Sequence, residues 1–481
     1  MLKKFKEKYN AMSVEVRASV AYMVCNILQR CMSFLTMPLF TRLMSAEEFG
    51  QFTVYSSWSS MLMIFLTLNM AYGSLNTALI RFEKDRVGYV SAIQAICVTL
   101  TGAFILLYLP FQNFWNAFLN MSTPLVILMA VEILSQFALT CWYTLKRFAF
   151  EYKGVVAVTL LIALCAPVLA VVLVLASQDK GVARILGYAG MNIAVGMVFF
   201  AINAARGRKA FSREYWKYAL GFNIPLIPYY LSQVVFTQSD RVMIDHICGT
   251  GDAGLYGLAH TLSMMLVFVL NAVNNSYVPW FYGRIKEGRA RENRPVANGI
   301  AALMAFMLMG VISLAPELIA ILGGPEYARA AWVVPPVTMS LLLLFYAQLF
   351  INVEFYYEEK NLLVWGSIAS AVLNVILNGL LIPRFGFVAA GYTTLVSYIV
   401  FALANYCTYR SLLKREGETK DAFDLKVLLL IFAGFTVLSF TAMALYEKPM
   451  IRYAIIAAVL TAVAVMHKPV IAYVKRVILH K

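Results

Sequence analysis

Long apolar segments alternate with short polar gaps from one end of the chain to the other. A transmembrane helix needs about 20 mostly apolar residues, and each apolar segment reaches that length. The pattern predicts an all-α integral membrane protein with fourteen transmembrane helices, and an even number places both termini on one side. The expected spans are residues 18–40, 52–79, 89–110, 123–145, 155–177, 183–205, 218–244, 253–282, 297–322, 332–357, 361–383, 387–409, 425–446 and 452–472.

Composition agrees with a membrane protein, because 61% of the 481 residues are hydrophobic and only 14% are charged. Ordinary soluble domains contain about 45–50% apolar residues, so this chain has too little polar surface to cover a soluble fold. The formal net charge of +15 would suit a nucleic-acid partner, so the positions of Lys and Arg decide what it means.

Lys and Arg gather in alternate gaps between the expected spans, for example within residues 3–8, 81–86, 206–217 and 284–294. The opposite gaps hold few, and residues 111–122, FQNFWNAFLNMS, hold none. By the positive-inside rule, this alternation predicts that both termini are cytoplasmic. The charge therefore indicates membrane topology and contact with anionic membrane lipids, and no nucleic-acid partner is expected.

A short pattern of an acidic residue, Gly and an aromatic residue occurs twice, as EFGQF around Gly50 and DAGLY around Gly254, which are 204 positions apart. The dipeptide Gly-Tyr recurs with the same spacing of 204, at Gly187 and Gly391. A repeat with an even number of helices predicts two parallel six-helix bundles. The expected organisation is an N-terminal bundle in residues 1–210, a second bundle in 211–416 and two additional transmembrane helices in 417–481.

Catalytic and metal-binding motifs are not expected in this chain. The seven cysteines are scattered without CxxC spacing, and the four histidines lack the spacing of zinc ligands. Residues 249–254, GTGDAG, match a dinucleotide-binding pattern, but no βαβ unit surrounds them. The chain is predicted to be no enzyme and to need no cofactor or metal.

Polar residues inside the spans point to a transport path, because they are expensive in a bilayer. Arg30 lies near the middle of the first span, where an arginine costs about 2.5–3.5 kcal/mol. Arg30 should therefore meet water, a carboxylate or an anionic ligand. The candidate substrate-binding residues are Asn26, Arg30, Asn69, Gln233, Arg241, His260, Asn271 and Asn274.

The second span is expected to carry Asn69, Tyr72 and Asn76 as a polar stripe on one continuous helix. Pro225 and Pro228 remove backbone donors early in the seventh span and favour a bend there. The plainer interpretation of each polar stripe is hydrogen bonding between helices, worth about 0.6 kcal/mol on average. Together the stripes fit a water-filled cavity better than isolated contacts.

Glu132, deep in the fourth span, and Asp240, in the seventh, are candidate coupling residues. A carboxyl group in the membrane either exchanges protons or balances a nearby cation. Glu132 therefore has two open interpretations, a protonatable coupling site or the partner of Arg30.

Three stretches resemble the polysaccharide (Wzx-like) flippases of O-antigen and capsule synthesis, within the MATE-like superfamily that includes multidrug exporters and the lipid II flippase. They are PLFTRLMSAEEFGQF, IPLIPYYLSQVVFTQSDRVMID followed by GLYGLA, and LNVILNGLLIPRFGFVAAGYTTLVSY. The resemblance implies that an undecaprenyl-diphosphate-linked oligosaccharide crosses the bacterial cytoplasmic membrane by alternating access. It implies the lipid-linked oligosaccharide and membrane lipids as partners, with polysaccharide polymerase machinery as an open further partner.

The physical properties of Arg30 agree with this implication, because a guanidinium binds a diphosphate through two parallel hydrogen bonds. Moving each negative charge out of a negative cytoplasm gains about 2.3 kcal/mol per 100 mV, so membrane potential can drive export, with proton or sodium antiport still open. Two other functions remain as alternatives: a MATE-type cation-coupled multidrug exporter, and a membrane-embedded glycosyltransferase or polymerase.

Overall fold

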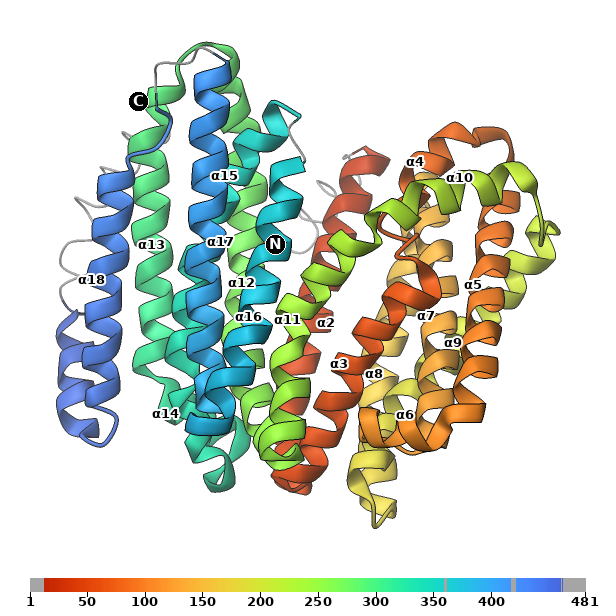
Figure 1. Ribbon diagram of the computed structural model, residues 1–481, viewed down its shortest axis with the longest axis horizontal. Helices are drawn as coiled ribbons and strands as arrows, with labels where there is room; N and C mark the ends of the chain where they lie inside the picture. Colours follow the sequence, from red (N-terminus) through yellow and green to blue (C-terminus); the bar gives the residue numbers. More distant parts are fainter. Residues whose placement is uncertain (1–12, 359–360, 417–420, 460, 462–481) are drawn as a thin grey trace, which may run out of the picture. The chain divides into compact units, whose positions relative to one another are not determined.

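The computed structural model describes residues 13–358, 361–416, 421–459 and 461, and these residues form helices and turns with no strand (Figure 1). Twelve helical segments in this part are long and apolar enough to cross a membrane. Helices suit a bilayer because nearly every backbone N–H and C=O finds its partner inside the segment. The predicted all-helical fold is confirmed at this level.

The predicted number of fourteen spans is not confirmed. The second expected span, 52–79, overlaps α3 (Ala46–Thr67), which is not one of the twelve apolar segments. Residues 46–60 of α3 include two Glu, one Gln and four Ser, which lower the hydropathy of the helix. The last expected span, 452–472, lies mostly outside the described residues, and its described part belongs to a short apolar helix, Pro449–Val459.

By internal contacts the chain forms two compact units, residues 1–254 and 255–481. The helices of the first unit are α2 (Val14–Leu43), α3, α4 (Leu75–Arg81), η1 (Glu83–Asp85), α5 (Arg86–Tyr108), η2 (Leu109–Phe111), α6 (Gln112–Leu119), α7 (Thr123–Phe148), α8 (Tyr152–Ala176), α9 (Lys180–Gly207), α10 (Arg213–Asn223), η3 (Ile224–Leu226) and α11 (Ile227–Cys248). The start of α12 (Thr250–Lys286) also belongs to this unit.

The second unit contains the rest of α12 and the helices that follow it in the chain. These are η4 (Ala290–Glu292), α13 (Asn293–Ser313), α14 (Ala315–Gly323), η5 (Pro325–Trp332), α15 (Val334–Tyr356), α16 (Asn361–Phe385), α17 (Val388–Arg415) and α18 (Leu425–Ala444).

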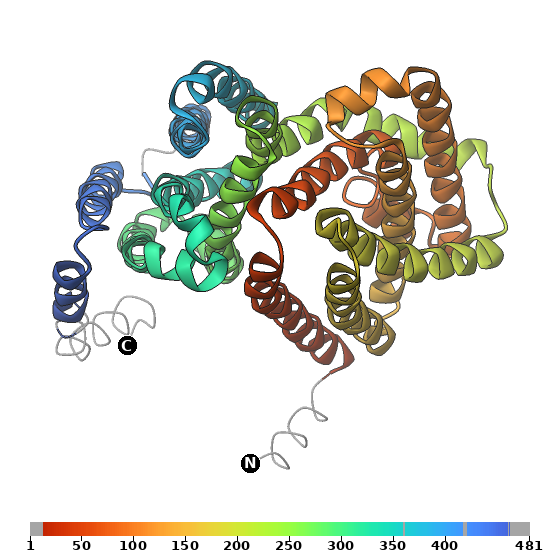
Figure 2. The same cartoon turned by 90° about the horizontal axis from the view of Figure 1, so that it is seen from below.

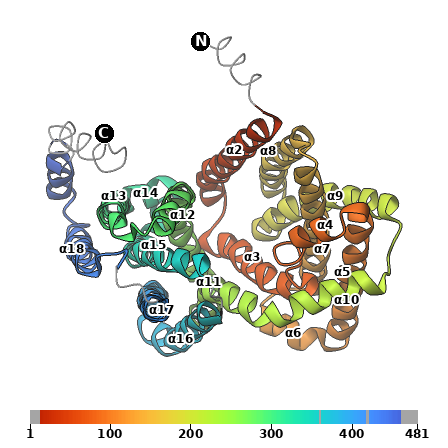
Figure 3. The same cartoon turned by 90° about the horizontal axis from the view of Figure 1, so that it is seen from above.

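Helix packing follows the same order in the two units (Figure 2). In the first unit α9 packs against both α7 and α8, and in the second unit α17 packs against both α15 and α16. Figure 3 shows the first unit along its helices, with α2 beside α8. α9 and α17, which correspond to the sixth and twelfth expected spans, therefore each pack against the two helices of the expected spans that precede them.

The start of α3 is fixed by local hydrogen bonds that the sequence encodes. The Ser45 hydroxyl accepts from the backbone N–H of Glu48 at 3.2 Å, and the Ser45 N–H donates to the Glu48 carboxylate at 2.8 Å. This capping box satisfies two backbone groups that the first turn leaves open. The charged residues between the first two spans thus begin a helix.

The second span is not one continuous helix, which corrects the predicted polar stripe. α3 ends at Thr67, and Leu68 and Asn69 adopt left-handed conformations with φ of 47° and 50° before α4 begins at Leu75. A left-handed residue ends a right-handed helix. Asn69, Tyr72 and Asn76 therefore lie in a turn and a separate short helix, and the stripe does not form.

The seventh span is interrupted at the prolines, where the 3-10 turn η3 joins α10 to α11. This interruption packs against the break in the second span. The Asn223 side-chain N–H donates to the Ser74 hydroxyl at 2.7 Å, and a Cβ on Gly73 would overlap the Asn223 side chain. Two broken helices therefore meet at their breaks within the first unit.

Candidate functional site

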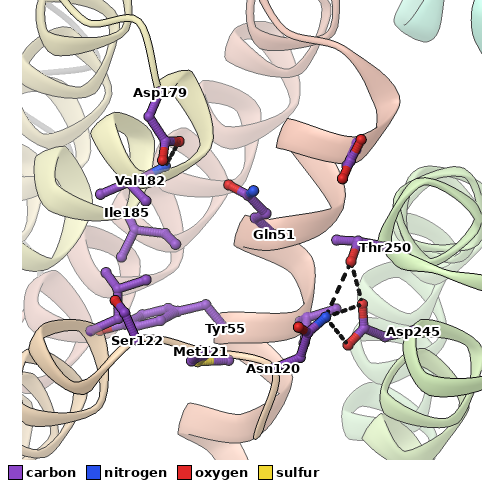
Figure 4. A pocket seen from close by; sticks show the side chains of 13 residues that line it. Gln51, Tyr55, Asn120, Met121, Ser122, Asp179, Val182, Ile185, Asp245 and Thr250 are labelled. Atoms are coloured by element: carbon purple, nitrogen blue, oxygen red, sulfur yellow. Dashed lines mark hydrogen bonds between the residues drawn. The ribbon is translucent and has the colours of Figure 1, made fainter. Parts of the chain in front are cut away.

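The first unit contains a pocket of about 340 Å³, within the range of roughly 300–1,000 Å³ that small-molecule sites occupy (Figure 4). α3, α7, α9 and α12 begin around it and α11 ends beside it. The pocket is lined by Glu47, Gln51, Val54, Tyr55, Asn120, Met121, Ser122, Leu125, Asp179, Val182, Ile185, Asp245 and Thr250.

The rim and the floor of the pocket differ in character. Exposed polar side chains form the rim, namely Glu47, Asn120, Ser122 and Asp179. Buried side chains form the floor, namely Val54, Tyr55, Ile185 and Asp245. The pocket thus offers hydrogen-bonding groups at its mouth and a mixed apolar and polar surface inside.

Asp245 is held by neutral donors at one side of the pocket (Figure 4). The Thr250 hydroxyl donates to it at 2.6 Å, and the Asn120 side-chain N–H donates to it at 3.2 Å. Asp245 lies in the last turn of α11, where a carboxylate opposes the helix dipole. These hydrogen bonds offset that cost and join the loop after α6 to the turn between α11 and α12.

The pocket floor is directly connected to the candidate coupling residue Glu132. The Tyr55 hydroxyl donates to Glu132 Oε2 at 2.8 Å, and the amides of Gln136 and Asn192 each donate to Oε1 at 2.8 Å. Glu132 is only 5% exposed, so these three bonds replace most of the water that a carboxylate needs. All three donors are neutral, and the coupling role of Glu132 stays a prediction.

The substrate-binding candidates on α2 lie on an accessible surface. Asn26 and Arg30 are both exposed, and Arg30 occupies the middle of the 30-residue helix. Asn69 is half-buried at the break after α3. Arg30 is thus solvent- or lipid-accessible in the middle of α2, and its predicted role stays a prediction.

The candidates on α11 lie on more than one side of that helix. Asp240 is buried at 2% exposure, whereas Gln233 and Arg241 are half-buried. The Arg241 guanidinium donates to the side-chain oxygen of Gln238, which also accepts from the Ser57 hydroxyl of α3. Arg241 thus takes part in a polar network between α11 and α3.

The candidates of the second unit lie along α12. His260 is buried at 7% exposure. Asn274 accepts a hydrogen bond from Asn352 of α15 at 2.9 Å, and Asn271 accepts a long one from Gln348 at 3.5 Å. For Asn274 the contact agrees with the plainer interpretation, hydrogen bonding between neighbouring helices.

The two glycines of the repeated pattern lie against each other. A Cβ on Gly50 would overlap the carbonyl of Thr250, and a Cβ on Gly254 would overlap the carbonyl of Ala46 and lie 3.0 Å from the backbone N of Gly50. Only glycine allows backbones to approach this closely. The recurring phrase therefore marks the crossing of α3 with the start of α12.

Several site residues had no signal in the sequence. No short motif links the site residues of three separate helices and one loop, which are Tyr55, Asn192, Asp245 and Asn120. A second buried polar group forms where Asn374 and Asn378 of α16 meet α17. The only sequence signal for this polar group is the presence of several Asn and Thr residues within 373–398.

A family described as "Polysaccharide biosynthesis protein" matches residues 16–283, more than half of the chain. The Lsg locus protein 1 of Haemophilus influenzae is 23% identical over 386 residues, which cover 74% of this chain and 88% of that protein. An uncharacterized membrane protein of the same organism is 21% identical over 293 residues, covering 57% of this chain and 67% of that protein.

Two solved structures share the fold. The lipid II flippase MurJ in an inward closed conformation has a TM-score of 0.64 at 12% identity, covering 94% of this chain and 100% of that chain. An inward-facing MATE family multidrug resistance transporter of the MOP superfamily has a TM-score of 0.60 at 12% identity, covering 84% of this chain and 100% of that chain. Family and fold confirm the resemblance inferred from the three sequence stretches.

Proposed function

The chain belongs to the polysaccharide biosynthesis protein family, and from this premise we propose that it carries a lipid-diphosphate-linked oligosaccharide across the bacterial cytoplasmic membrane by alternating access. The family match over residues 16–283 is the observation that carries the proposal. A fold shared with a lipid flippase and a drug transporter supports transport as the activity. Polysaccharide polymerase machinery remains a further proposed partner.

The proposed architecture is two parallel six-helix bundles, residues 1–210 and 211–416, with two more helices in 417–481 and both termini in the cytoplasm. The recurring packing of α9 and α17 supports the repeat. Charge within the first unit supports the orientation. α7 and α9 begin at the acidic pocket and end in Lys146, Arg147 and Arg206, as the positive-inside rule requires of a cytoplasmic end.

Arg30 is the proposed contact for the diphosphate. It is exposed in the middle of α2, and its guanidinium offers the paired donors that a phosphate oxygen pair accepts. The other proposed substrate contacts are Asn26, Asn69, Gln233, Arg241, His260, Asn271 and Asn274. Glu132 and Asp240 are the proposed coupling residues, supported by their burial in the first unit.

Thermal unfolding of the purified full chain in detergent tests the ligand class. Undecaprenyl diphosphate should raise the melting temperature, since ligand at 100 times its dissociation constant adds about 2.7 kcal/mol of stability. Ethidium should leave it unchanged. Arg30→Ala should abolish the diphosphate effect and polymer export, and Arg30→Lys should restore only part, because an ammonium cannot reproduce the guanidinium fork.

Arg42→Ala is the matched control, because Arg42 is also exposed on α2 but lies in its last turn. It should retain both the ligand effect and export. Full export by Arg30→Ala would contradict the assigned role of Arg30. Stabilisation by ethidium and not by the diphosphate would favour the cation-coupled exporter and make Glu132 or Asp240 the leading site.

A further inference from the structure

We propose that the pocket of the first unit binds the saccharide part of the substrate and selects neutral or amino sugars over acidic ones. The inference rests on the proposed function for its source of saccharide, but binding of a free sugar tests it separately. It assigns the sugar and the diphosphate to different places, the sugar to the pocket lined by α3, α9 and α11 and the diphosphate to Arg30 on α2.

The polar groups of the pocket suit sugar hydroxyls. Glu47 and Asp179 supply exposed carboxylate oxygens, which accept hydrogen bonds from neighbouring sugar hydroxyls. The side-chain oxygen of Gln51 is buried and accepts no hydrogen bond from the described residues. That oxygen packs against Gly181, where a Cβ would overlap it, so the carboxylates of Glu47 and Asp179 are the acceptors that a sugar hydroxyl can reach.

Apolar side chains line other parts of the same pocket. Leu125, Val182 and Ile185 present hydrocarbon surface. A pyranose ring has hydroxyls at its edge and C–H groups on its faces, so it needs both kinds of contact. A pocket with apolar walls and a few placed polar groups is the usual form of a small-molecule site.

The charge of the pocket excludes the diphosphate as its ligand. No Lys, Arg or His lines it, and three carboxylates do. Two basic residues of α9 have contacts elsewhere: the Lys180 ammonium donates to the Leu43 carbonyl at 2.7 Å, and the Arg184 guanidinium lies 4.0 Å from the centre of the Phe52 ring. A negatively charged pocket repels phosphates and uronic acids and admits neutral or amino sugars.

A metal ion is a poorer fit than a sugar. In the described parts of the chain, no three His, Cys, Asp or Glu side chains converge closely enough to hold a metal. The carboxylates are instead distributed around the pocket, and Asp245 is already engaged by Asn120 and Thr250. A ligand in the pocket would contact Tyr55, whose hydroxyl donates a hydrogen bond to the proposed coupling residue Glu132.

Ligand-observed NMR on the full chain in lipid nanodiscs tests the inference, with N-acetylglucosamine, glucosamine and glucuronate as probes. The first two should bind, and glucuronate should bind at least about tenfold more weakly. Glu47→Gln with Asp179→Asn should weaken glucosamine binding by about tenfold or more, because two charged acceptors become neutral. Asn at position 179 retains the cap that Asp179 provides for α9.

Two further variants complete the experiment. Glu447→Gln is the matched control, with the same substitution at an exposed glutamate outside the pocket, and it should bind as the wild type does. Val182→Phe keeps every charge but fills the pocket, and it should abolish binding of both sugars.

Absence of sugar binding to the wild type, equal binding of glucuronate, or unchanged binding in Val182→Phe would overturn the inference. So would displacement of bound sugar by millimolar sodium or calcium, which would make the pocket a cation site. If sugar binds while undecaprenyl diphosphate has no effect on unfolding, the pocket is supported and the proposed lipid-linked substrate fails. If undecaprenyl diphosphate raises the melting temperature while no sugar binds, the pocket inference is rejected and the proposed lipid-linked substrate is retained.

Discussion

The hairpin of α8 and α9 in the first unit and the hairpin of α16 and α17 in the second are packed by different means. In the first, Gly187 of α9 lies so close to Ala170 of α8 that a Cβ on the glycine would overlap the alanine backbone. In the second, buried amides and hydroxyls meet. Asn378 donates to Asn374 at 3.1 Å and accepts from the Thr393 hydroxyl.

The two hairpins can be compared residue by residue by using the predicted repeat spacing of 204 positions. In that register Asn374 and Asn378 correspond to Ala170 and Val174, which are fully buried and apolar. The order of the helices is therefore kept between the two units while the chemistry of the contact is not. A contact of small residues tolerates no added volume, whereas a polar contact tolerates volume but not the loss of a partner.

The largest expected effect comes from adding one methyl group to the first hairpin. Gly187→Ala should destabilise the protein by about 1–3 kcal/mol, because α8 and α9 must separate to admit a Cβ. The measurement is the thermal unfolding midpoint in detergent. Gly190→Ala, on the same helix with open space around its Cβ position, is the control.

In an exposed helix, Ala is favoured over Gly by about 1 kcal/mol, so Gly190→Ala should be neutral or slightly stabilising. If Gly187→Ala and Gly190→Ala behave alike, the close contact between α8 and α9 is not a feature of the folded protein.

The helices, their approximate bounds and the family followed from the sequence because each rests on local information. Apolar length predicts the spans, and the spacing of Gly50 and Gly254 predicts the repeat. The close contact between those two glycines could not be foreseen, because it depends on how two distant segments cross.

The candidate site was predicted less well than the fold. Glu132 was identified as a buried carboxyl group, but Tyr55 and Asn192, which complete its hydrogen bonds, lie 77 and 60 positions away in the chain. The predicted polar stripe through Asn69 was wrong because α3 ends before that residue. The signal for the end of α3 is weak, because Leu68 is an ordinary helix former and only Asn69, which tolerates a left-handed conformation, marks the turn.

An intermediate effect is expected from the polar hairpin. Asn378→Leu keeps a similar volume but removes the hydrogen bonds that Asn378 makes with the Thr393 hydroxyl and with the Asn374 side-chain oxygen. Measured hydrogen bonds between membrane helices average about 0.6 kcal/mol and reach about 1.7, so a loss in that range is expected. Thermal unfolding measures it.

The double variant Asn378→Leu with Thr393→Val supplies the control, because it replaces both partners by apolar groups. It should recover part of the lost stability. A double variant that is as unstable as the sum of both single variants would show that the two side chains act independently and that the polar contact does not hold this hairpin together.

The smallest effect on stability is expected at Glu132, whose counterpart in the register of 204 residues is Pro336. The first unit therefore carries a buried carboxyl group that the second lacks at that place. In Glu132→Gln the amide oxygen can still accept from Gln136 and Asn192, and the Tyr55 hydroxyl can accept from the new amide N–H. Each of these oxygen and nitrogen atoms keeps at least one hydrogen bond, so unfolding should change by less than about 0.5 kcal/mol.

Function should respond differently from stability, because a glutamine cannot exchange a proton. If Glu132 is the coupling residue, Glu132→Gln should fold normally and lose the pH dependence of export in reconstituted vesicles. Glu132→Leu, the contrast variant, should also unfold at a lower temperature, since it strands three donors. A large loss of stability in Glu132→Gln would instead mean that the charge itself is needed, as an ion pair with Arg30 requires. The two variants thus decide between the two interpretations of this carboxyl group.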